Sequence, residues 1–205
     1  MNTAIVVPGD QRTKDWYKNR LGVITASSCE TIMSKYQRAG YINKLIAEKL
    51  TGVQESLEFN ANVKWGNEQE EFARLYYEKQ TGNSVEEVSF VFADDKKRVG
   101  CSPDGFVGED GLIEIKCPMS KTHIGYITEQ SEPKKYFLQM QFQMYVTGRK
   151  WCDFVSFDPR LPKEIKMFIK RIDIDLASQI MIDKSVKETT LAIDKFLTKN
   201  KLEWT

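Results

Sequence analysis

The sequence is poor in the side chains that most often hold zinc or act as nucleophiles. Its 205 residues include one histidine, His123, and four cysteines that are widely scattered and form no CxxC pair. Zinc sites need several Cys and His ligands, and Ser-His-Asp catalysis needs a histidine, usually with a GxSxG turn, so both chemistries are disfavoured. A chain of this length does not need disulfide staples. We therefore expect reduced, structural thiols at Cys29, Cys101, Cys117 and Cys152.

The chain also lacks a long apolar run and a strong charge of either sign. No stretch approaches the eighteen or so apolar residues of a membrane helix, and the start MNTAIVVPGD lacks the pattern of a signal peptide. These features favour a cytoplasmic protein that contacts no membrane. The net charge of +1 gives no argument for nucleic acid, but residues 1–50 are locally basic. That segment either faces phosphates or is an ordinary solvated surface.

No internal repeat, low-complexity tract or Pro/Gly/Ser linker divides the sequence, so we expect one domain over residues 1–205. Hydrophobic periodicity and turn residues predict helices over residues 13–20, 25–34, 40–51, 66–80, 133–147 and 175–199. The same signals predict strands over residues 84–93, 98–107, 111–117, 151–158 and 164–174. This alternation indicates an α/β fold with a central mixed β-sheet flanked by helices.

Several local features refine these elements. Ser27 and Glu30 have the spacing of a capping box at the start of the second helix. Glycines follow three of the helices, at residues 52, 82 and 148, and residues 108–111 have the composition of a hairpin turn. The helix over 66–80 is expected to be amphipathic through Phe72, Leu75, Tyr76 and Lys79. The last helix is expected to pack on the sheet, or less simply on another subunit, through Leu176, Ile180, Val186, Leu191, Ile193 and Phe196.

The candidate chemistry lies in two short segments around the predicted hairpin. Side chains alternate along a strand, so Glu114 and Lys116 project to one side, and Asp104 can sit opposite them. Two converging carboxylates are costly to bury unless a cation neutralises them, and oxygen ligands suit Mg²⁺, with Mn²⁺ as a substitute. The carbonyl of Ile115 could be a further ligand. The alternative is a surface hairpin on which Glu114 and Lys116 merely pair.

The order of several motifs resembles a known family. These motifs are Arg-Leu-Gly-Val-Ile-Thr-Ala-Ser at 20–27, Trp-Gly at 65–66 followed by Glu70, Cys-Ser-Pro-Asp-Gly at 101–105, Leu-Ile-Glu-Ile-Lys-Cys-Pro at 112–118 and Gln-Met-Gln at 139–141. The arrangement is similar to the PD-(D/E)xK nuclease superfamily, and more narrowly to the lambda exonuclease (YqaJ-like) family of phage recombination enzymes. The resemblance extends from about residue 16 to residue 160 and implies a restriction-endonuclease-like fold.

The resemblance also implies an activity. Members of this family digest one strand of double-stranded DNA from its 5′ end, release mononucleotides and leave a 3′ single-stranded tail. They are homotrimeric rings threaded by DNA, and they act with a single-strand annealing protein in a phage-infected bacterial host. By resemblance, then, the chain is a magnesium-dependent 5′ to 3′ exodeoxyribonuclease with Asp104, Glu114 and Lys116 as catalytic residues.

Four further positions take their roles from the resemblance. Arg20 and Ser27 are expected to bind the 5′-phosphate, although Ser27 is equally well explained as a helix cap. The Trp-Gly-x-x-x-Glu spacing selects Glu70 as a second-metal or water-positioning carboxylate, although it lies in a run of acidic residues. Gln139 is preferred to Gln141 for contact with the active site or the nucleophilic water.

Two questions stay open at this point. Aromatic residues could stack on bases or separate strands, but aromatics at helical spacing are more often part of the core, so none is given a role: Trp16, Tyr17, Tyr36 and Trp65. The function also has two rivals. One is an endonuclease of the same superfamily, such as a junction resolvase or restriction-type enzyme, and the other is a non-catalytic DNA-binding module.

Overall fold

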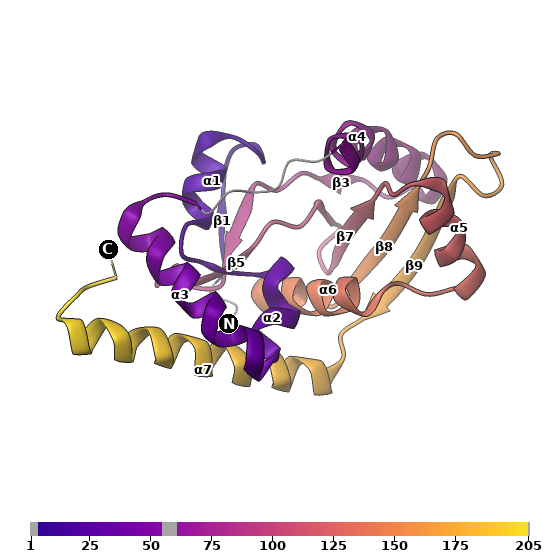
Figure 1. The fold of residues 1–205 in the computed structure, drawn as a ribbon. Coiled ribbons are helices and arrows are strands. Elements are labelled where there is room, and N and C mark those ends of the chain that lie inside the picture. The colour runs from indigo at the N-terminus through magenta and orange to yellow at the C-terminus, as the bar shows by residue number, and fades with distance from the viewer. Residues whose placement is uncertain (1–3, 55–60, 205) are drawn as a thin grey trace.

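The computed structural model describes residues 4–54 and 61–204, in which helices surround two β-sheets (Figure 1). The helices are α1 (Lys14–Arg20), α2 (Cys29–Met33), α3 (Lys35–Thr51), α4 (Ala61–Thr81), α5 (Ser120–Glu129), α6 (Lys134–Thr147) and α7 (Leu176–Asn200), with a short 3₁₀ turn η1 (Ala26–Ser28). None of the helices in the described residues is long and apolar enough to cross a membrane.

The strands form a four-stranded sheet and a five-stranded sheet. The first has the order β1-β4-β5-β2, with bounds β1 (Ile5–Val7), β4 (Phe90–Phe92), β5 (Val99–Cys101) and β2 (Ile24–Thr25). The second has the order β3-β6-β7-β8-β9, with bounds β3 (Val85–Glu86), β6 (Gly105–Val107), β7 (Gly111–Lys116), β8 (Trp151–Phe157) and β9 (Met167–Asp173). Both sheets mix parallel and antiparallel pairs, which confirms the predicted α/β class but divides the expected central sheet in two.

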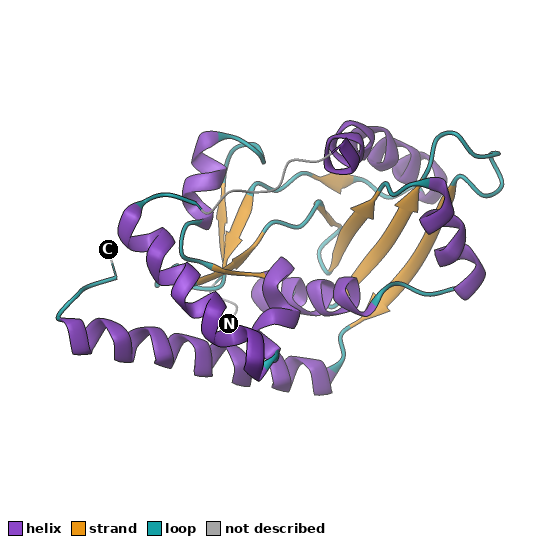
Figure 2. Ribbon diagram, in the orientation of Figure 1, coloured by secondary structure: helices purple, strands orange, loops and turns teal. Residues whose placement is uncertain are grey.

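An interrupted hairpin joins the two sheets. β4 pairs with β5 in the first sheet, and β3 pairs with β6 in the second, so residues 87–89 and 102–104 are the breaks between them (Figure 2). Pro103 lies in the second break and has no N–H to donate to a ladder. The side chain of Gln11 holds the two breaks together, because its Nε2 donates to Val88 O at 2.8 Å and to Pro103 O at 2.9 Å.

Strand β7 is covered on both faces. Ile113 and Ile115 pack with Ala73 and Tyr77 of α4, whereas Leu112 belongs to the larger core cluster that includes Met140, Phe142 and Met144 of α6. Figure 1 shows α4 on one side of β7 and α6 on the other. Since side chains alternate along a strand, Glu114 lies on the same side as Leu112 and faces α6.

Most predicted elements are present with shifted ends. Positive φ angles at Gly52, Gly82 and Gly148 confirm that left-handed glycines end α3, α4 and α6, and the hairpin β6–β7 is also confirmed. The helix predicted over 40–51 begins earlier, at Lys35, because Ser34 caps it by accepting from Gln37 N. Sequence analysis did not predict the short strands β1 and β2 or helix α5, whose N-cap position makes no side-chain capping bond.

The capping box predicted at Ser27 and Glu30 is wrong. Residues 24–25 form strand β2, and Ser27 lies inside the 3₁₀ turn that follows it. The Oγ of Ser27 is 3.3 Å from Thr25 Oγ1, and neither short helix there has a side-chain cap. Ser27 is therefore not needed as a helix cap.

The apolar faces predicted for two helices are also largely wrong. On α4, Phe72 is 58% exposed and Leu75 is 53% exposed, while Ala73 and Tyr77 are buried. On α7, Val186 and Ile193 are buried as expected, but four other predicted contacts are exposed: Leu176, Ile180, Leu191 and Phe196. Helix α7 packs mainly on α2, α3 and α6 rather than on a sheet.

Candidate active site

The break between β5 and β6 positions Asp104. Its Oδ2 accepts a hydrogen bond from the backbone N–H of Ile115 at 2.6 Å, which ties the break to the middle of β7. This bond places Asp104 beside the strand that carries Glu114 and Lys116, as the sequence predicted. The other carboxylate oxygen, Oδ1, makes no hydrogen bond to a described residue and is free for another partner.

Glu114 and Lys116 lie on the same face of β7 and form an ion pair between Glu114 Oε1 and Lys116 Nζ. Glu114 is 1% exposed, whereas the side chain of Lys116 is 24% exposed. The Lys116 ammonium also lies 5.1 Å from the ring centroid of Tyr136 on α6. The pair therefore lies at the boundary between the core and solvent. It is not the fully exposed pair expected if this were an ordinary surface hairpin.

Three glutamines alternate along α6, and two of them bind Glu114. Gln139 Nε2 donates to Glu114 Oε1 at 2.7 Å, and Gln143 Nε2 donates to Glu114 Oε2 at 2.6 Å. Gln141 points elsewhere and donates to Asp173 O at 2.8 Å. The structure thus places Gln139 rather than Gln141 at the candidate site. It adds Gln143, which sequence reasoning missed although an i, i+4 pair of amides on an apolar helix is a visible signal.

The electrostatics of the site are those of crowded carboxylates. Removal from water, and then the charge of Glu114, raise the pKa of Asp104 well above its ordinary value, although Lys116 acts in the opposite direction. Removal from water lowers the pKa of Lys116, but Glu114 and Asp104 outweigh that effect, so the pKa of this lysine lies above its ordinary value. Lys116 is therefore a fixed positive charge, and negative charge remains in excess around Asp104.

Glu70, on α4, lies near Asp104. Its charge contributes to the raised pKa of Asp104, and both residues line a pocket with residues 9–12 of the N-terminal loop. Arg12 in that loop forms an ion pair with Glu70 Oε2 and has a positive φ of 65°, which is uncommon for a residue other than glycine. Glu70 is thus the acid of its run that faces the site, as the family spacing implied.

Arg20 and Ser27 line one pocket together with Gln139. The other described residues that line it are Gln11, Trp16, Ala26 and Ser102, and none of these is a carboxylate. Arg20 Nη1 lies 3.4 Å from Ser102 Oγ, two residues before Asp104. A basic pocket therefore opens next to the acidic one, with Gln139 common to its lining and to the Glu114 contacts.

The aromatic residues without an assigned role have different surroundings. Trp16 Nε1 donates to Ser102 Oγ at 2.8 Å, and the Trp16 ring is packed edge-on against Tyr17. The guanidinium of Arg160 lies over the ring of Trp65, with Cζ 4.7 Å from its centroid. Tyr36, by contrast, is 96% exposed, so the expectation that it belongs to the core is wrong.

The cysteines are structural, as expected, and the surroundings of His123 give it a structural role too. All four cysteines are buried and free. His123 is completely buried and bonds through its two ring nitrogens to Ser156 Oγ at 2.7 Å and to Ile165 O at 2.8 Å. These two bonds join α5 to β8 and to the connection between β8 and β9, and neither goes to Asp104, Glu114 or Lys116.

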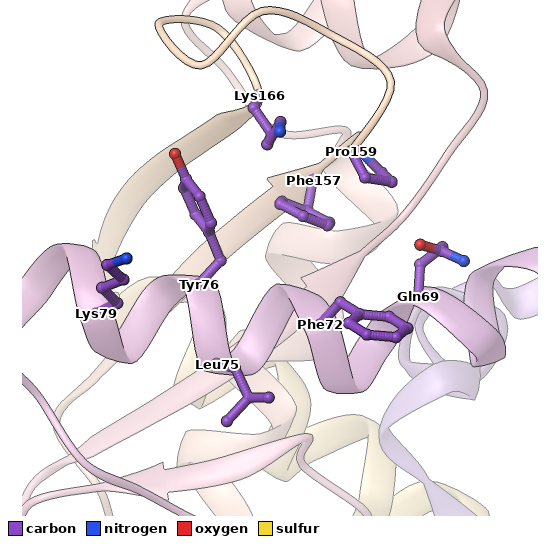
Figure 3. A pocket seen from close by; sticks show the side chains of 8 residues that line it. All are labelled: Gln69, Phe72, Leu75, Tyr76, Lys79, Phe157, Pro159 and Lys166. Carbon is purple, nitrogen blue, oxygen red and sulfur yellow. The ribbon is translucent and has the colours of Figure 1, made fainter.

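A separate apolar pocket lies on the outer face of α4 (Figure 3). Side chains of α4 line it together with residues near the β8–β9 connection, and three of the α4 residues, Phe72, Leu75 and Tyr76, were expected on the apolar side of that helix. The full lining is Gln69, Phe72, Leu75, Tyr76, Lys79, Phe157, Pro159 and Lys166. None of the candidate catalytic residues lines this pocket. It is therefore distinct from the carboxylate site.

The carboxylate site has the donors that a hard divalent cation requires. Asp104, Glu114 and the backbone carbonyl of Ile115 offer oxygen ligands, and the excess negative charge around Asp104 favours a cation. No three His, Cys, Asp or Glu side chains of the described residues converge on one point as a complete ligand set. Mg²⁺ typically binds one or two carboxylates and keeps several waters, so the residues present fit it.

Comparison with known proteins identifies the family. Residues 15–150 match the YqaJ-like viral recombinase domain. The chain is 41% identical to an alkaline exonuclease, LHK-Exo, from Laribacter hongkongensis, with a TM-score of 0.85 over 92% of this chain and 96% of that one. A second structure of LHK-Exo, in complex with dAMP, gives a TM-score of 0.83 over 92% of this chain and 98% of that one, also at 41% identity.

Two more distant relatives are similar over much of the chain. A phage related exonuclease from Haemophilus somnus is 16% identical, with a TM-score of 0.68 over 86% of this chain and 96% of that one, and shares the fold. An uncharacterized protein of Acanthamoeba polyphaga mimivirus is 27% identical over 160 residues, which are 72% of this chain but only 29% of that protein. The likeness to the exonuclease structures confirms the restriction-endonuclease-like fold. The chain therefore belongs to the YqaJ-like viral recombinase family, as its resemblance to lambda exonuclease implied.

Proposed function

We propose that this protein is a magnesium-dependent exonuclease that digests one strand of double-stranded DNA from its 5′ end, releasing 5′-mononucleotides. The observation that carries the proposal is the convergence of Asp104, Glu114 and Lys116 at the break between the two sheets. The family match and the 41% identity to an alkaline exonuclease support a DNA-degrading hydrolase. The dAMP complex of that relative is consistent with a nucleotide product.

Each of these residues would have a separate role in phosphodiester hydrolysis. Asp104, Glu114 and the carbonyl of Ile115 would hold Mg²⁺, for which Mn²⁺ can substitute. Bound there, the cation would polarise the phosphodiester and favour ionisation of the attacking water. Lys116 is held beside Glu114, where its fixed positive charge can stabilise the charge that develops on the phosphate oxygens. Gln139 and Glu70 would orient the attacking water from α6 and α4.

The neighbouring basic pocket would select the end of the strand. Arg20 can present two parallel N–H donors to a terminal phosphate, and Ser27 contributes a hydroxyl from the 3₁₀ turn. Gln139 lines this pocket and also binds Glu114, so a 5′-phosphate bound there would lie next to the catalytic carboxylates. This arrangement supports attack close to a phosphorylated end rather than within a duplex.

The assembly and the biological role follow from family membership. We propose a homotrimeric ring that encloses DNA and leaves 3′ single-stranded overhangs for recombination by strand annealing. A single-strand annealing protein would then be its partner, in the cytoplasm of a bacterial host that carries the phage or prophage. The family match over residues 15–150 supports this role.

The first test is nucleotide release from linear, 5′-phosphorylated duplex DNA with Mg²⁺. We expect the wild-type protein to release 5′-mononucleotides, and both EDTA and Asp104→Ala to abolish release. Covalently closed circular DNA serves as the control, because an exonuclease leaves it intact and an endonuclease cuts it. DNA binding without any release, in Mg²⁺ or Mn²⁺, would instead favour the non-catalytic module.

A further inference from the structure

Gln143 belongs to none of the motifs that identify the family, and we propose that it positions Glu114 to bind the divalent cation. This inference rests on the metal site proposed above. Gln143 lies one helical turn after Gln139 on α6 and is completely buried. Its Nε2 donates to Glu114 Oε2 at 2.6 Å.

The two oxygens of Glu114 differ in their remaining capacity to bind. Oε1 accepts from both Lys116 Nζ and Gln139 Nε2, which occupy its two lone pairs. Among the described residues, Oε2 accepts from Gln143 alone and keeps one lone pair. Oε2 is therefore the oxygen that can bind a cation, and the bond from Gln143 sets the direction of its remaining lone pair.

Stability alone does not explain a glutamine at this position. Gln143 Oε1 is buried and has no hydrogen-bond partner among the described residues. A buried acceptor without a partner lowers the stability of a protein, and an apolar side chain of similar size would avoid that penalty. What an apolar side chain could not supply is the donor to Glu114, and ligand orientation by such neighbouring donors commonly strengthens metal binding.

Gln141 provides a matched control on the same helix. Like Gln143 it is completely buried, but its Oε1 accepts a hydrogen bond from Gln179 Nε2 of α7 at 3.0 Å. Its Nε2 donates to Asp173 O at 2.8 Å, and its Oε1 accepts from Asp175 N at 2.9 Å. Gln141 thus joins α6 to the connection between β9 and α7, and its loss should affect folding without changing Glu114.

The experiment is Mn²⁺ titration by calorimetry of the wild type, Gln143→Met and Gln141→Met. Methionine keeps the length of the side chain but has no N–H donor. We expect Gln143→Met to weaken Mn²⁺ affinity about 10- to 100-fold, whereas Gln141→Met binds Mn²⁺ as the wild type does and unfolds at a lower temperature. In nuclease assays, Gln143→Met should need more Mg²⁺ for half-maximal rate, while its affinity for DNA in EDTA stays unchanged.

Three results would overturn the inference. The first is equal Mn²⁺ affinity in the wild type and Gln143→Met. The second is equal weakening in both variants, which would assign the effect to the packing of α6. The third is absence of Mn²⁺ binding by the wild type, which would also remove the proposed metal site. Should Gln143→Met fail to fold, Gln143→Leu removes the same donor with a different shape and is judged by the same outcomes.

Discussion

The guanidinium of Arg20 lies over the ring of Trp16, with Cζ 4.4 Å from the ring centroid. Trp16 is itself held by hydrogen bonds from Nε1 to Ser89 O at 3.1 Å and to Ser102 Oγ at 2.8 Å. Burial lowers the pKa of Arg20, but an arginine stays charged at neutral pH. Arg20 is therefore a positive charge on a rigid support, at the pocket that also contains Ser27 and Gln139.

Removing this charge should change the preference for DNA ends. We expect Arg20→Ala to slow digestion of 5′-phosphorylated ends about tenfold to a hundredfold more than digestion of 5′-hydroxyl ends, since a charge-assisted hydrogen bond is lost only with the phosphate. Arg20→Lys keeps the charge without the planar fork, so its preference for phosphorylated ends should lie between those of the wild type and Arg20→Ala. Initial rates on matched duplexes measure the effect, and equal slowing on both kinds of end would refute the 5′-phosphate assignment.

Glu70 should affect turnover more than folding. We expect Glu70→Gln to reduce the rate about tenfold to a hundredfold at saturating Mg²⁺, because an amide cannot accept a proton from water or bind a cation as a carboxylate does. Arg12→Gly is the matched control, since it removes the ion-pair partner of Glu70 and glycine tolerates the positive φ at this position. A wild-type rate for Glu70→Gln would make Glu70 an ordinary surface acid.

Lys116 should contribute mainly to the chemical step. Lys116→Met keeps the aliphatic stem but removes the positive charge beside Glu114, so we expect a loss of about 100- to 1,000-fold in single-turnover rate. Binding of duplex DNA in EDTA, followed by fluorescence anisotropy, should change far less. A variant that bound DNA poorly yet cleaved at the normal rate once saturated would show that Lys116 serves binding instead.

Tyr77 should make stability depend on alkaline pH. Removal from water and its hydrogen bond to Asp153, with 2.7 Å between the oxygens, raise the pKa of Tyr77 to about 12. The unfolded chain loses the phenolic proton near pH 10 while the folded protein retains it, so the free energy of unfolding falls as pH rises from about 10 to about 12. Tyr77→Phe should weaken this dependence. Urea unfolding at pH 9 and pH 11 measures the fall in the free energy of unfolding. An equal fall in the wild type and Tyr77→Phe would contradict the prediction.

The catalytic strand could be predicted because its signals are local. The alternation of Ile113, Glu114, Ile115 and Lys116 fixes which side chains share a face, and the turn at residues 108–111 fixes the hairpin. Asp104 joins them through a contact that spans only eleven positions. The position of Gln143 could not be derived in this way, because its partner Glu114 is 29 residues away on another element.

The face of α4 shows why periodicity alone was not enough. Phe72, Leu75 and Tyr76 form the more hydrophobic stripe, yet Ala73 and Tyr77 face the core. A small alanine permits close approach of the helix to Ile113 and Ile115 of β7, and this packing decides the orientation of the helix. Hydrophobicity by sequence position carries no information on which neighbour an element will meet.

The interrupted hairpin has a consequence for partial unfolding. Asp104 comes from the break that leads out of the four-stranded sheet, whereas Glu114 and Lys116 belong to the five-stranded sheet. Fraying of the first sheet alone would separate the carboxylates while β7, β8 and β9 stayed paired. A mildly denatured population could thus retain most of its circular dichroism and already be unable to hold an ion. Loss of cation binding is therefore expected to be an early sign of damage to this protein.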